Sequence, residues 1–292
     1  MSPSSQLPQL KNKAFEKGIC IQGYEGSFHQ VAANHFFGKG VPVLPCDTFR
    51  QLVRLSSDPG ESAGGVMAIE NSIAGSILPN YSLLQKSKLV VVGELYLSIS
   101  QNLLANKDVE LSQIREVHSH PMAILQCLDY LEQHEWKLIE TEDTALSARH
   151  ISQHRHRHTA AIGSKLAAEL YNLRILTPDI HTMKNNVTRF LILVNRQLAE
   201  PVTDANKASV YFQTDHSQGA LARVLTSIAA GGVNLSKLQS MPIQGSNFKY
   251  GFYADLEFES RQRLDRVLKE MTALTNSLKI FGIYKKGKQI KA

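Results

Sequence analysis

The stretch GICIQGYEGSFHQVAANHFFG, residues 18–38, decides the fold class. An apolar run (Gly18–Gly23) leads into a glycine-containing loop. A segment with helical spacing of its apolar residues (Phe28–Phe37) follows and stops at Gly38. A short apolar strand, a tight loop and an amphipathic helix form the repeating unit of α/β proteins. This stretch therefore predicts a sheet covered by helices.

The same alternation of strand-like and helical runs continues to Val194. Strands are predicted at Val41–Cys46, Gly65–Ile69, Leu89–Val92, Glu116–Ser119, Trp136–Glu140, Thr159–Ile162, Leu173–Thr177 and Thr188–Val194. The helical runs between them predict a mostly parallel sheet with helices on both faces. In such sheets, polar side chains that serve chemistry gather where strands end and helices begin.

The order of predicted elements changes after a Pro/Asp/Asn-containing linker, residues 197–206. The order of elements there is strand, helix, strand, strand, helix, strand, which is the ferredoxin-like arrangement. Domains are therefore expected at 18–196 and 207–285. They are flanked by a disordered N-terminal tail, residues 1–17, and a basic tail, residues 286–292.

Composition excludes several classes of protein. The 292 residues include 32 Lys+Arg and 26 Asp+Glu, so the net charge is +6. Residues 205–292 carry 13 basic and 6 acidic side chains, whereas residues 1–204 carry 19 and 20. A mildly basic small domain with a basic tail is typical of a solvated surface, so no nucleic-acid partner is expected. No apolar run has the ~20 residues that cross a bilayer, and no signal peptide is visible. Three dispersed cysteines fit a reducing, cytoplasmic location, with no membrane partner.

Two loops carry polar groups at strand ends. Gly26 and Ser27 lie in the loop before the first helix, where backbone amides and the hydroxyl suit a carboxylate; a plain turn with Ser27 as N-cap is the simpler interpretation. Glu70-Asn71-Ser72 ends an apolar strand, either as functional groups or as an Asx/Ser turn.

Further motifs contain histidine or arginine. His118-Ser119-His120-Pro121, with Gln126 behind it, favours helix capping over a metal site. The histidines 150, 154, 156 and 158 resemble a metal tract, but their polar neighbours favour a solvated loop. In Thr188-Arg189-Phe190 the guanidinium suits a carboxylate, and the alternative is a surface arginine. No metal site is predicted, and no nucleotide fingerprint indicates a cofactor.

Six segments, taken in order, resemble the prephenate dehydratase family. They are GYEGSFHQVAA (Gly23–Ala33), GVMAIENSIAGSI (Gly65–Ile77), SHPMAILQC (Ser119–Cys127), DTALSA (Asp143–Ala148), AAIGSKLAAELYNL (Ala160–Leu173) and NNVTRFLIL (Asn185–Leu193). Residues 207–285 resemble an ACT domain, an amino-acid-sensing module, through QGALA (Gln218–Ala222), GVNLSKLQSMP (Gly232–Pro242) and FYADLEF (Phe252–Phe258).

The resemblance implies a carbon–oxygen lyase of phenylalanine biosynthesis that converts prephenate to phenylpyruvate, water and CO2. Aromatisation drives that reaction, so neither metal nor cofactor is implied. Thr188 would hydrogen-bond the departing hydroxyl, Arg189 would bind a carboxylate, and a buried Glu70 could serve as the acid. The implied catalytic residues are Thr188, Arg189, Phe190, Glu70 and Asn71; the implied substrate-binding residues are Ser27, Gly26, Ser72, Ser119 and Gln126.

The resemblance also implies a two-lobed, periplasmic-binding-protein-like catalytic domain. Lobe 1 is expected at about 18–96 and 174–196, and lobe 2 at about 97–173. A homodimer or homotetramer is implied, with L-phenylalanine as a possible effector at Gly219, Ala220, Leu221, Gln239, Ser240, Met241 and Pro242. Two ACT motifs depart from the family pattern, so inhibition by phenylalanine stays open. No chorismate mutase segment is visible, which implies a monofunctional enzyme. The alternatives are an arogenate dehydratase and a non-catalytic amino-acid sensor.

Overall fold

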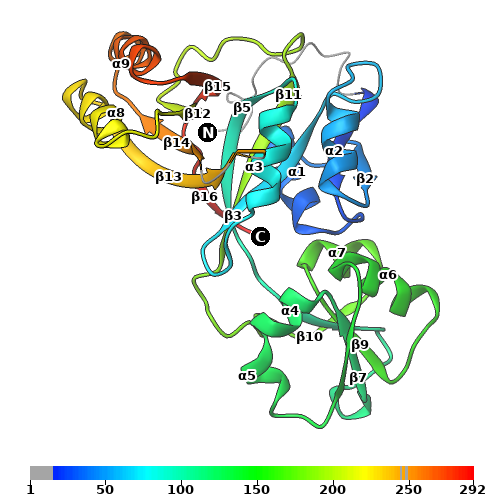
Figure 1. Ribbon diagram of the computed structural model, residues 1–292. Helices are drawn as coiled ribbons and strands as arrows, with labels where there is room; N and C mark the ends of the chain where they lie inside the picture. The colour runs from blue at the N-terminus through cyan, green and yellow to red at the C-terminus, as the bar shows by residue number, and fades with distance from the viewer. Residues whose placement is uncertain (1–15, 244, 247–248) are drawn as a thin grey trace.

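The computed structural model describes residues 16–243, 245–246 and 249–292. The predicted disordered tail, residues 1–17, therefore lies outside the described residues except for its last two positions. The described residues form three sheets, each with helices packed against it (Figure 1). We call the three units lobe 1, lobe 2 and the C-terminal domain.

Lobe 1 is built on a seven-stranded sheet in the described part of the chain, with the order β16-β5-β11-β3-β1-β2 and β4 paired to β3. Its strands are β1 (Ile19–Gln22), β2 (Val43–Cys46), β3 (Gly64–Asn71), β4 (Gly75–Ser76), β5 (Leu89–Ser98), β11 (Val187–Asn195) and β16 (Gln289–Lys291). Its helices are α1 (Phe28–Phe37), α2 (Phe49–Ser56) and α3 (Leu78–Lys86).

The sheet of lobe 1 is mostly parallel in strand direction, as expected, but it is mixed because β11 and β4 run opposite to the other five strands. β1 runs parallel to β2 and β3, but β11 lies antiparallel between β3 and β5. The cause is the route of the chain. After β5 it leaves for lobe 2 and returns beside β5 in the opposite direction, which makes the two strands antiparallel neighbours.

The first helix forms where the sequence predicts it. Ser27 is its N-cap and accepts a hydrogen bond from the Gln30 amide, while Gly38 ends it with φ of 103°, a backbone conformation that favours glycine. The apolar face of the helix, which includes Val31 and Phe37, is buried against the sheet of lobe 1. Packing of this kind holds the loop before the helix at the carboxyl end of β1.

Lobe 2 contains a five-stranded sheet among the described residues, in the order β10-β6-β9-β7-β8. Its strands are β6 (Asn102–Ala105), β7 (Glu116–Ser119), β8 (Lys137–Glu140), β9 (Thr159–Gly163) and β10 (Arg174–Thr177). Its helices are α4 (Pro121–Gln126), α5 (Leu128–Leu131), α6 (Thr144–Gln153) and α7 (Lys165–Leu170), with a short 3-10 turn at Leu111–Gln113.

The strand pairing moves both predicted lobe boundaries. Leu97 lies within β5 and pairs with Thr188, and residues 174–177 pair with β6 of lobe 2. The chain therefore crosses after Ser98 and returns before Val187, instead of near residues 97 and 173. Glu94 interrupts the apolar run in the sequence of β5. The sequence therefore predicts a strand that ends at Val92, whereas β5 continues to Ser98.

The C-terminal domain contains β12 (Lys207–Gln213), α8 (Ala220–Ala230), β13 (Asn234–Pro242), β14 (Tyr250–Glu257), α9 (Arg261–Leu274) and β15 (Ser277–Tyr284). Its antiparallel sheet has the order β13-β14-β12-β15, and this β-α-β-β-α-β connection is ferredoxin-like, as predicted.

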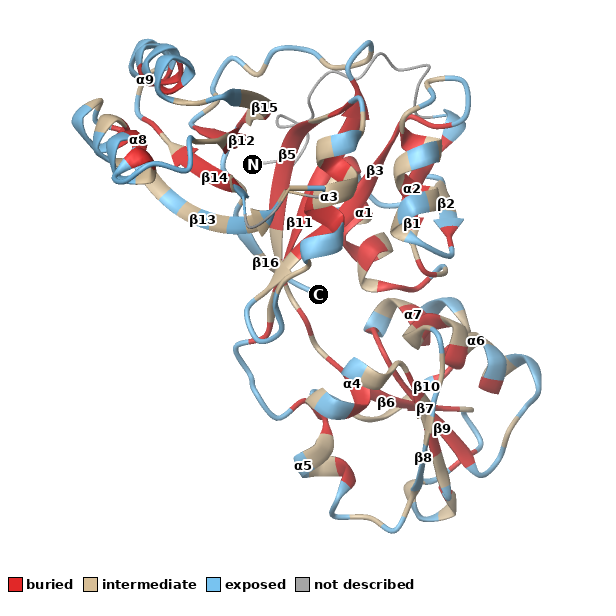
Figure 2. Cartoon of the chain, viewed as in Figure 1, coloured by how far each residue is buried: buried red, intermediate tan, exposed pale blue. Residues whose placement is uncertain are grey.

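This domain packs on one flank of lobe 1, whereas lobe 2 lies below lobe 1 in the view of Figure 1. β15 lies so close to β5 that a Cβ added to Gly282 would come within 1.9 Å of the Val91 carbonyl oxygen. Figure 2 shows buried residues along the central strands of lobe 1 and along β14, whereas β13 is intermediate or exposed.

The predicted basic tail is partly structured. Residues 289–291 form β16, which pairs in parallel with β5 at the edge of the lobe 1 sheet. The sequence does not predict this strand. A three-residue edge strand that contains Gln, Ile and Lys cannot be distinguished from a solvated tail by its composition.

Candidate active site between the lobes

Two of the predicted motifs meet where β3 and β11 end side by side. Asn71 and Thr188 are register partners. The Asn71 Oδ1 atom accepts hydrogen bonds from the amides of Ile73 and Ala74, both at 2.9 Å. Since these bonds fix the orientation of the amide, its nitrogen must face Thr188, and it donates to Thr188 Oγ1 at 2.9 Å. The Asx turn expected for Asn71 is therefore present, and its amide nitrogen contacts Thr188.

A chain of side-chain amides extends from this pair into lobe 2. Asn71 also donates to Asn186 Oδ1 at 2.7 Å, and Asn186 Nδ2 donates to Gln126 Oε1 at 3.0 Å. Gln101 Nε2 reaches the same Gln126 oxygen at 3.4 Å. We call Asn71, Gln101, Gln126, Asn186 and Thr188 the amide network. It joins both lobes and both crossing segments, so it depends on how the lobes sit relative to each other.

Gln101 stands out in the amide network. Its side chain is buried, and its Oε1 atom has no hydrogen-bond partner among the described residues. A buried oxygen without a partner is costly, which marks a place where a bound molecule can supply a donor. Sequence reasoning missed Gln101 and named Asn186 only as part of a turn. For Asn186, the available signal was its position directly before the Thr-Arg-Phe motif.

The glycine loop lies directly against lobe 2. Ser164 donates from Oγ to the Gly26 carbonyl oxygen, and Tyr171 donates to the Glu25 carbonyl oxygen at 2.6 Å. A Cβ on Gly26, whose φ is +90°, would lie 2.9 Å from Ala167 Cα. The loop therefore works here as a contact between lobes, for which glycine is required.

The predicted anion-binding groups of this loop are occupied within the protein. Gly26 N donates to Gln30 Oε1 at 2.6 Å, and Ser27, which is buried, caps the first helix. The simpler interpretation of Ser27 as an N-cap is confirmed. A substrate would have to displace these bonds to use either group.

The two other predicted serines differ. Ser72 ties the loop after β3 to β11, since its Oγ donates to the Asn185 carbonyl oxygen at 3.0 Å and accepts from Val187 N at 2.9 Å. Ser119 is fully buried and donates to the Ile162 carbonyl oxygen at 2.9 Å inside lobe 2. Its predicted contact with substrate is therefore wrong in this structure, because the hydroxyl is sealed from solvent.

Arg189 faces away from the lobe boundary, which overturns its predicted role in carboxylate binding. Neighbouring residues of a strand point to opposite faces, so Arg189 lies on the face that the C-terminal domain covers. Its Nη2 is 2.6 Å from Glu94 Oε2, and its Nη1 pairs with Asp255. Burial alone would lower the pKa of Arg189, but Asp255, Tyr284 and Glu94 raise it well above its ordinary value.

This guanidinium is part of a buried charge cluster between lobe 1 and the C-terminal domain, comprising Glu94, Arg189, Lys207, Asp255 and Tyr284. Lys207 Nζ lies 3.0 Å from Glu94 Oε1, and Tyr284 Oη lies 3.2 Å from Arg189 Nη2. Burial would raise the pKa of Asp255, but Arg189 and Lys207 outweigh it and hold the pKa below the usual value. Sequence reasoning missed Glu94, although an acid inside an apolar strand indicates a buried partner.

Glu70 also turns toward the C-terminal domain. Lys237 of β13 pairs with its carboxylate, and Arg189 Nη1 lies 3.9 Å from it. About a third of the Glu70 side chain is exposed. The proposed proton donor is therefore neither deeply buried nor directed at Thr188, and this prediction is wrong.

Phe190 is a core residue, and its predicted catalytic role is therefore wrong. It is buried, and its ring meets that of His29 edge-on with 5.0 Å between centroids. His29 accepts from Ala68 N at 3.4 Å, and burial lowers the pKa of His29 to about 3. This pair supports the strand ends that carry Asn71 and Thr188.

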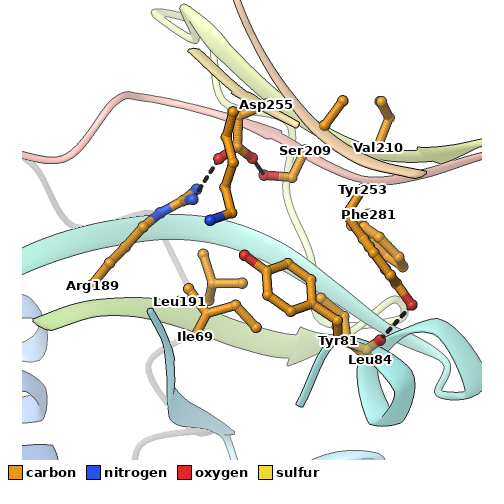
Figure 3. A pocket seen from close by; sticks show the side chains of 12 residues that line it. Ile69, Tyr81, Leu84, Arg189, Leu191, Ser209, Val210, Tyr253, Asp255 and Phe281 are labelled. Atoms are coloured by element: carbon orange, nitrogen blue, oxygen red, sulfur yellow. Dashed lines mark hydrogen bonds and ion pairs between the residues drawn. The ribbon is translucent and has the colours of Figure 1, made fainter. Parts of the chain in front are cut away.

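A cavity of about 10 Å³ lies within the contact between lobe 1 and the C-terminal domain (Figure 3). Arg189 and Asp255 line its polar side, while Tyr81, Tyr253 and Phe281 line its apolar side. Such a volume is at the lower limit for holding one water molecule. The cavity is therefore too small for a metabolite, and it lies on the opposite face of β11 from Thr188.

The predicted effector residues fall on two elements of the C-terminal domain. Gly219 has φ of 76° and precedes α8, whose first two residues are Ala220 and Leu221. The other four predicted residues, Gln239, Ser240, Met241 and Pro242, end the exposed strand β13. Met241 packs toward lobe 1, in the apolar cluster that contains Tyr253 and Phe281.

We also searched the described residues for a metal site and for a membrane-spanning helix. Among the described residues, three histidines at the end of α6 are close enough to share a metal ion. Within that same part of the chain, no helix combines the length and the apolar character needed to cross a membrane.

Comparisons with known proteins agree with the arrangement of motifs. Residues 19–198 match the sequence model of the family described as prephenate dehydratase. A bifunctional chorismate mutase/prephenate dehydratase of Aquifex aeolicus is 33% identical over 271 residues, covering 92% of this chain and 73% of the relative. Arogenate dehydratase 2 of Petunia hybrida is 31% identical over 299 residues, covering 96% and 75%.

Solved structures resemble the whole chain, including the C-terminal domain. A prephenate dehydratase of Arthrobacter aurescens in complex with L-Phe has a TM-score of 0.79 at 26% identity, covering 92% of this chain and 90% of that one. A structure described as GqqA, a novel type of quorum quenching acylase, has a TM-score of 0.83 at 30% identity, covering 92% and 97%. The family match spans most of the chain and includes Asn71, Gln126 and Thr188, and therefore this chain belongs to the prephenate dehydratase family.

Proposed function

We propose that this protein converts prephenate to phenylpyruvate, CO2 and water. The family match supports the reaction, and the Asn71–Thr188 hydrogen bond carries the proposal at the level of the site. The ring carboxylate of prephenate leaves as CO2, and its bonding electron pair moves into the ring. That shift expels the hydroxyl at the opposite ring carbon, which gains a proton and leaves as water.

Thr188 is the group that assists the departing hydroxyl. Because Asn71 Nδ2 donates to Thr188 Oγ1, the hydroxyl proton of Thr188 is directed away from Asn71 and is available to a substrate. A threonine hydroxyl is a poor acid, so it acts by donating a positioned hydrogen bond to the oxygen on which negative charge develops. Asn71 is the positioning residue for that donor.

Recognition of the substrate carboxylates falls to groups at the lobe boundary. Gln126 Oε1 is occupied by Asn186 and Gln101, which leaves its amide nitrogen as a donor. Arg149 of α6 lies over the Tyr24 ring of the glycine loop, 5.0 Å from its centroid, and forms no ion pair among the described residues. Arg149 thus replaces Arg189 as the proposed cation. Gly26, Ser27 and Ser72 remain proposed contacts that a bound substrate would reach by displacing internal bonds.

Phenylpyruvate formation from prephenate by the purified protein tests the proposal. In Thr188→Ala we expect kcat to fall by about 10²-fold with little change in KM, because a donor used in the transition state is lost. Thr188→Ser, which keeps the hydroxyl, should retain most of the activity. Wild-type protein that forms no phenylpyruvate, or a Thr188→Ala variant with undiminished kcat, would refute this function.

The same assay separates the remaining candidates. Arogenate undergoes the same elimination and differs only in its side chain, and the petunia relative bears the name of that activity. Turnover of arogenate without turnover of prephenate would identify an arogenate dehydratase. Saturable binding of either compound without turnover would favour the amino-acid sensor.

We further propose that the catalytic lobes form a periplasmic-binding-protein-like pair and that the C-terminal domain is an ACT regulatory domain in a homodimer or homotetramer. The ferredoxin-like order of its elements supports the domain assignment, and the relative solved with L-Phe supports phenylalanine as effector. Addition of L-phenylalanine should lower turnover in the assay above. Unchanged turnover together with no detectable binding of L-phenylalanine would reject it as the effector.

A further inference from the structure

The carboxyl end of α6 gathers three histidines that are spread over seven residues of sequence. His150 lies in the last turn of the helix, His154 is its C-cap, and Arg155 follows with φ of 49°. His156 N donates to the Ile151 carbonyl oxygen at 3.1 Å, and Arg155 N donates to the Ser152 carbonyl oxygen at 3.2 Å. These two bonds form a Schellman motif, which folds the chain back over the helix end. His156 is thereby brought beside the other two rings.

The three rings present ligand atoms to a common point. One ring nitrogen from each of His150, His154 and His156 lies within 4.8 Å of the corresponding atoms of the other two. Ring centroids are 4.2 Å apart for His150 and His154 and 5.3 Å apart for His150 and His156. Zinc holds imidazole nitrogen at about 2.0–2.1 Å. Small rotations of these accessible rings would close the set around one ion.

One ring of the three has a backbone partner for its Nδ1 atom. Nδ1 of His154 faces the His150 carbonyl oxygen at 3.0 Å, and it must donate there because a carbonyl oxygen only accepts. In the neutral ring the proton therefore sits on Nδ1, which leaves the lone pair on Nε2. Donation from the second ring nitrogen to a backbone carbonyl is the usual outer-shell arrangement of metal-binding histidine.

One neighbouring cation is neutralised within the protein, since Arg157 is paired with Asp108 at 3.2 Å. His150 and His154 are exposed and His156 is half-buried, so water can complete the coordination sphere. We propose that His150, His154 and His156 form a binding site for a divalent transition-metal ion of the class that prefers imidazole, with Zn²⁺ as the probe.

None of the three histidines belongs to the proposed reaction centre, although His150 directly follows Arg149, the proposed substrate cation. The site lies at the carboxyl end of α6, whereas the N-cap of the same helix, Asp143, faces the glycine loop. Ten residues of helix span about 15 Å. Its test therefore relies on metal binding and gives the same answer whether or not prephenate is the substrate.

Titration of the purified full chain with Zn²⁺, followed by calorimetry and by competition with a chromophoric zinc indicator, tests the site. We expect one equivalent to bind with an affinity at least tenfold above that of His154→Ala, and a similar loss in His150→Ala and in His156→Ala. His158→Ala is the matched control. His158 belongs to the same tract, but its Nδ1 faces the Gln113 carbonyl oxygen at 2.9 Å and it is outside the cluster. Its affinity should match that of the wild type.

The site would be refuted by absence of stoichiometric Zn²⁺ binding, by wild-type affinity in all three cluster variants, or by an equal loss in His158→Ala. Arg155→Gly provides a second variant that keeps every histidine. Glycine adopts the backbone conformation of position 155 freely, so the Schellman motif and the Zn²⁺ affinity should both persist. Loss of binding in this variant would also contradict the proposal.

Discussion

Thr188 and Arg189 are adjacent in sequence but serve opposite faces of the same strand. Thr188 joins the amide network at the lobe boundary, while Arg189 enters the charge cluster beneath the C-terminal domain. Because β-strand side chains alternate, one peptide unit separates the proposed chemistry from the contact with the proposed regulatory domain. The motif thus links two sites that otherwise lie on different surfaces.

The Asn71 amide can be tested with an isosteric change. In Asn71→Asp the carboxylate can still accept from the Ile73 and Ala74 amides but cannot donate to Thr188. The hydroxyl of Thr188 should then donate to the new carboxylate instead of to the substrate. We expect kcat to fall about 10–100-fold with a smaller change in KM, measured by steady-state kinetics. An unchanged kcat would show that Asn71 does not position Thr188.

His29 makes stability depend on pH. Its pKa is about 3 in the folded protein and about 6.5 when unfolded, so between these values the unfolded state binds more protons. The contribution of neutral His29 is complete above pH 6.5 and is lost as the pH falls toward 3. We expect a slope of up to about 1.4 kcal/mol per pH unit in this window. Urea unfolding of His29→Gln should show a flatter profile, and parallel profiles would refute the assignment.

Among the elements, the glycine loop offers a direct test of the lobe contact. A Cβ in Gly26→Ala would press on Ala167 of α7, which should hold the lobes apart and disturb the amide network. We expect a raised KM and a reduced kcat for prephenate. Gly40→Ala is the control, since Gly40 has φ of +82° but nothing within 4 Å of an added Cβ. Equal kinetic effects in the two variants would show that backbone strain, rather than lobe contact, is responsible.

Elements whose pattern is local could be predicted from sequence. The first helix has its cap, apolar face and terminal glycine within one segment, and its bounds are those observed. The sequence analysis places β10 in lobe 1 instead of lobe 2, and it does not predict β16. Both strands are defined only by their pairing partners, β6 for β10 and β5 for β16. The helix α3 has a weak apolar pattern and is held by a buried bond from Asn80 to the Ala68 carbonyl oxygen.

The sequence identifies some residues of the candidate site but not the roles of others. Asn71 and Gln126 were identified beside Thr188 through family motifs, and the structure brings all three into one network. The roles of Arg189 and Glu70 could not be deduced, because strand alternation alone does not say which face a later domain will cover. Contacts with Asp255, 66 residues after Arg189, and with Lys237, 167 residues after Glu70, decided both.

At the scale of the whole molecule, the buried charge cluster should make the attachment of the C-terminal domain sensitive to acid. Asp255 has a pKa below its usual 3.8, so its stabilising effect is present above about that pH and is lost as the pH falls through the lower folded value. Asp255→Asn should cost about 3 kcal/mol at neutral pH, because Arg189 loses a buried partner.

Unfolding by urea at pH 7 down to pH 2, followed by circular dichroism, measures this effect. The Asp255→Asn variant should also lack the acid-dependent loss that the carboxylate causes. Asp204→Asn removes an exposed carboxylate paired with Lys285 and should change little. A neutral-pH stability of Asp255→Asn equal to that of the wild type would mean that the cluster does not hold the two units together.

Lobe 2 is inserted at a single point of lobe 1. Ser98 pairs with Val187, and Ile99 N donates to the Asn186 carbonyl oxygen at 2.7 Å, so the chain departs and re-enters between neighbouring antiparallel strands. That is the place of a hairpin turn, where two residues such as Asn-Gly would suffice. Lobe 2, which carries Gln126 and Arg149, is therefore a cassette. It can be exchanged, in evolution or by design, without cutting through the core on which the C-terminal domain rests.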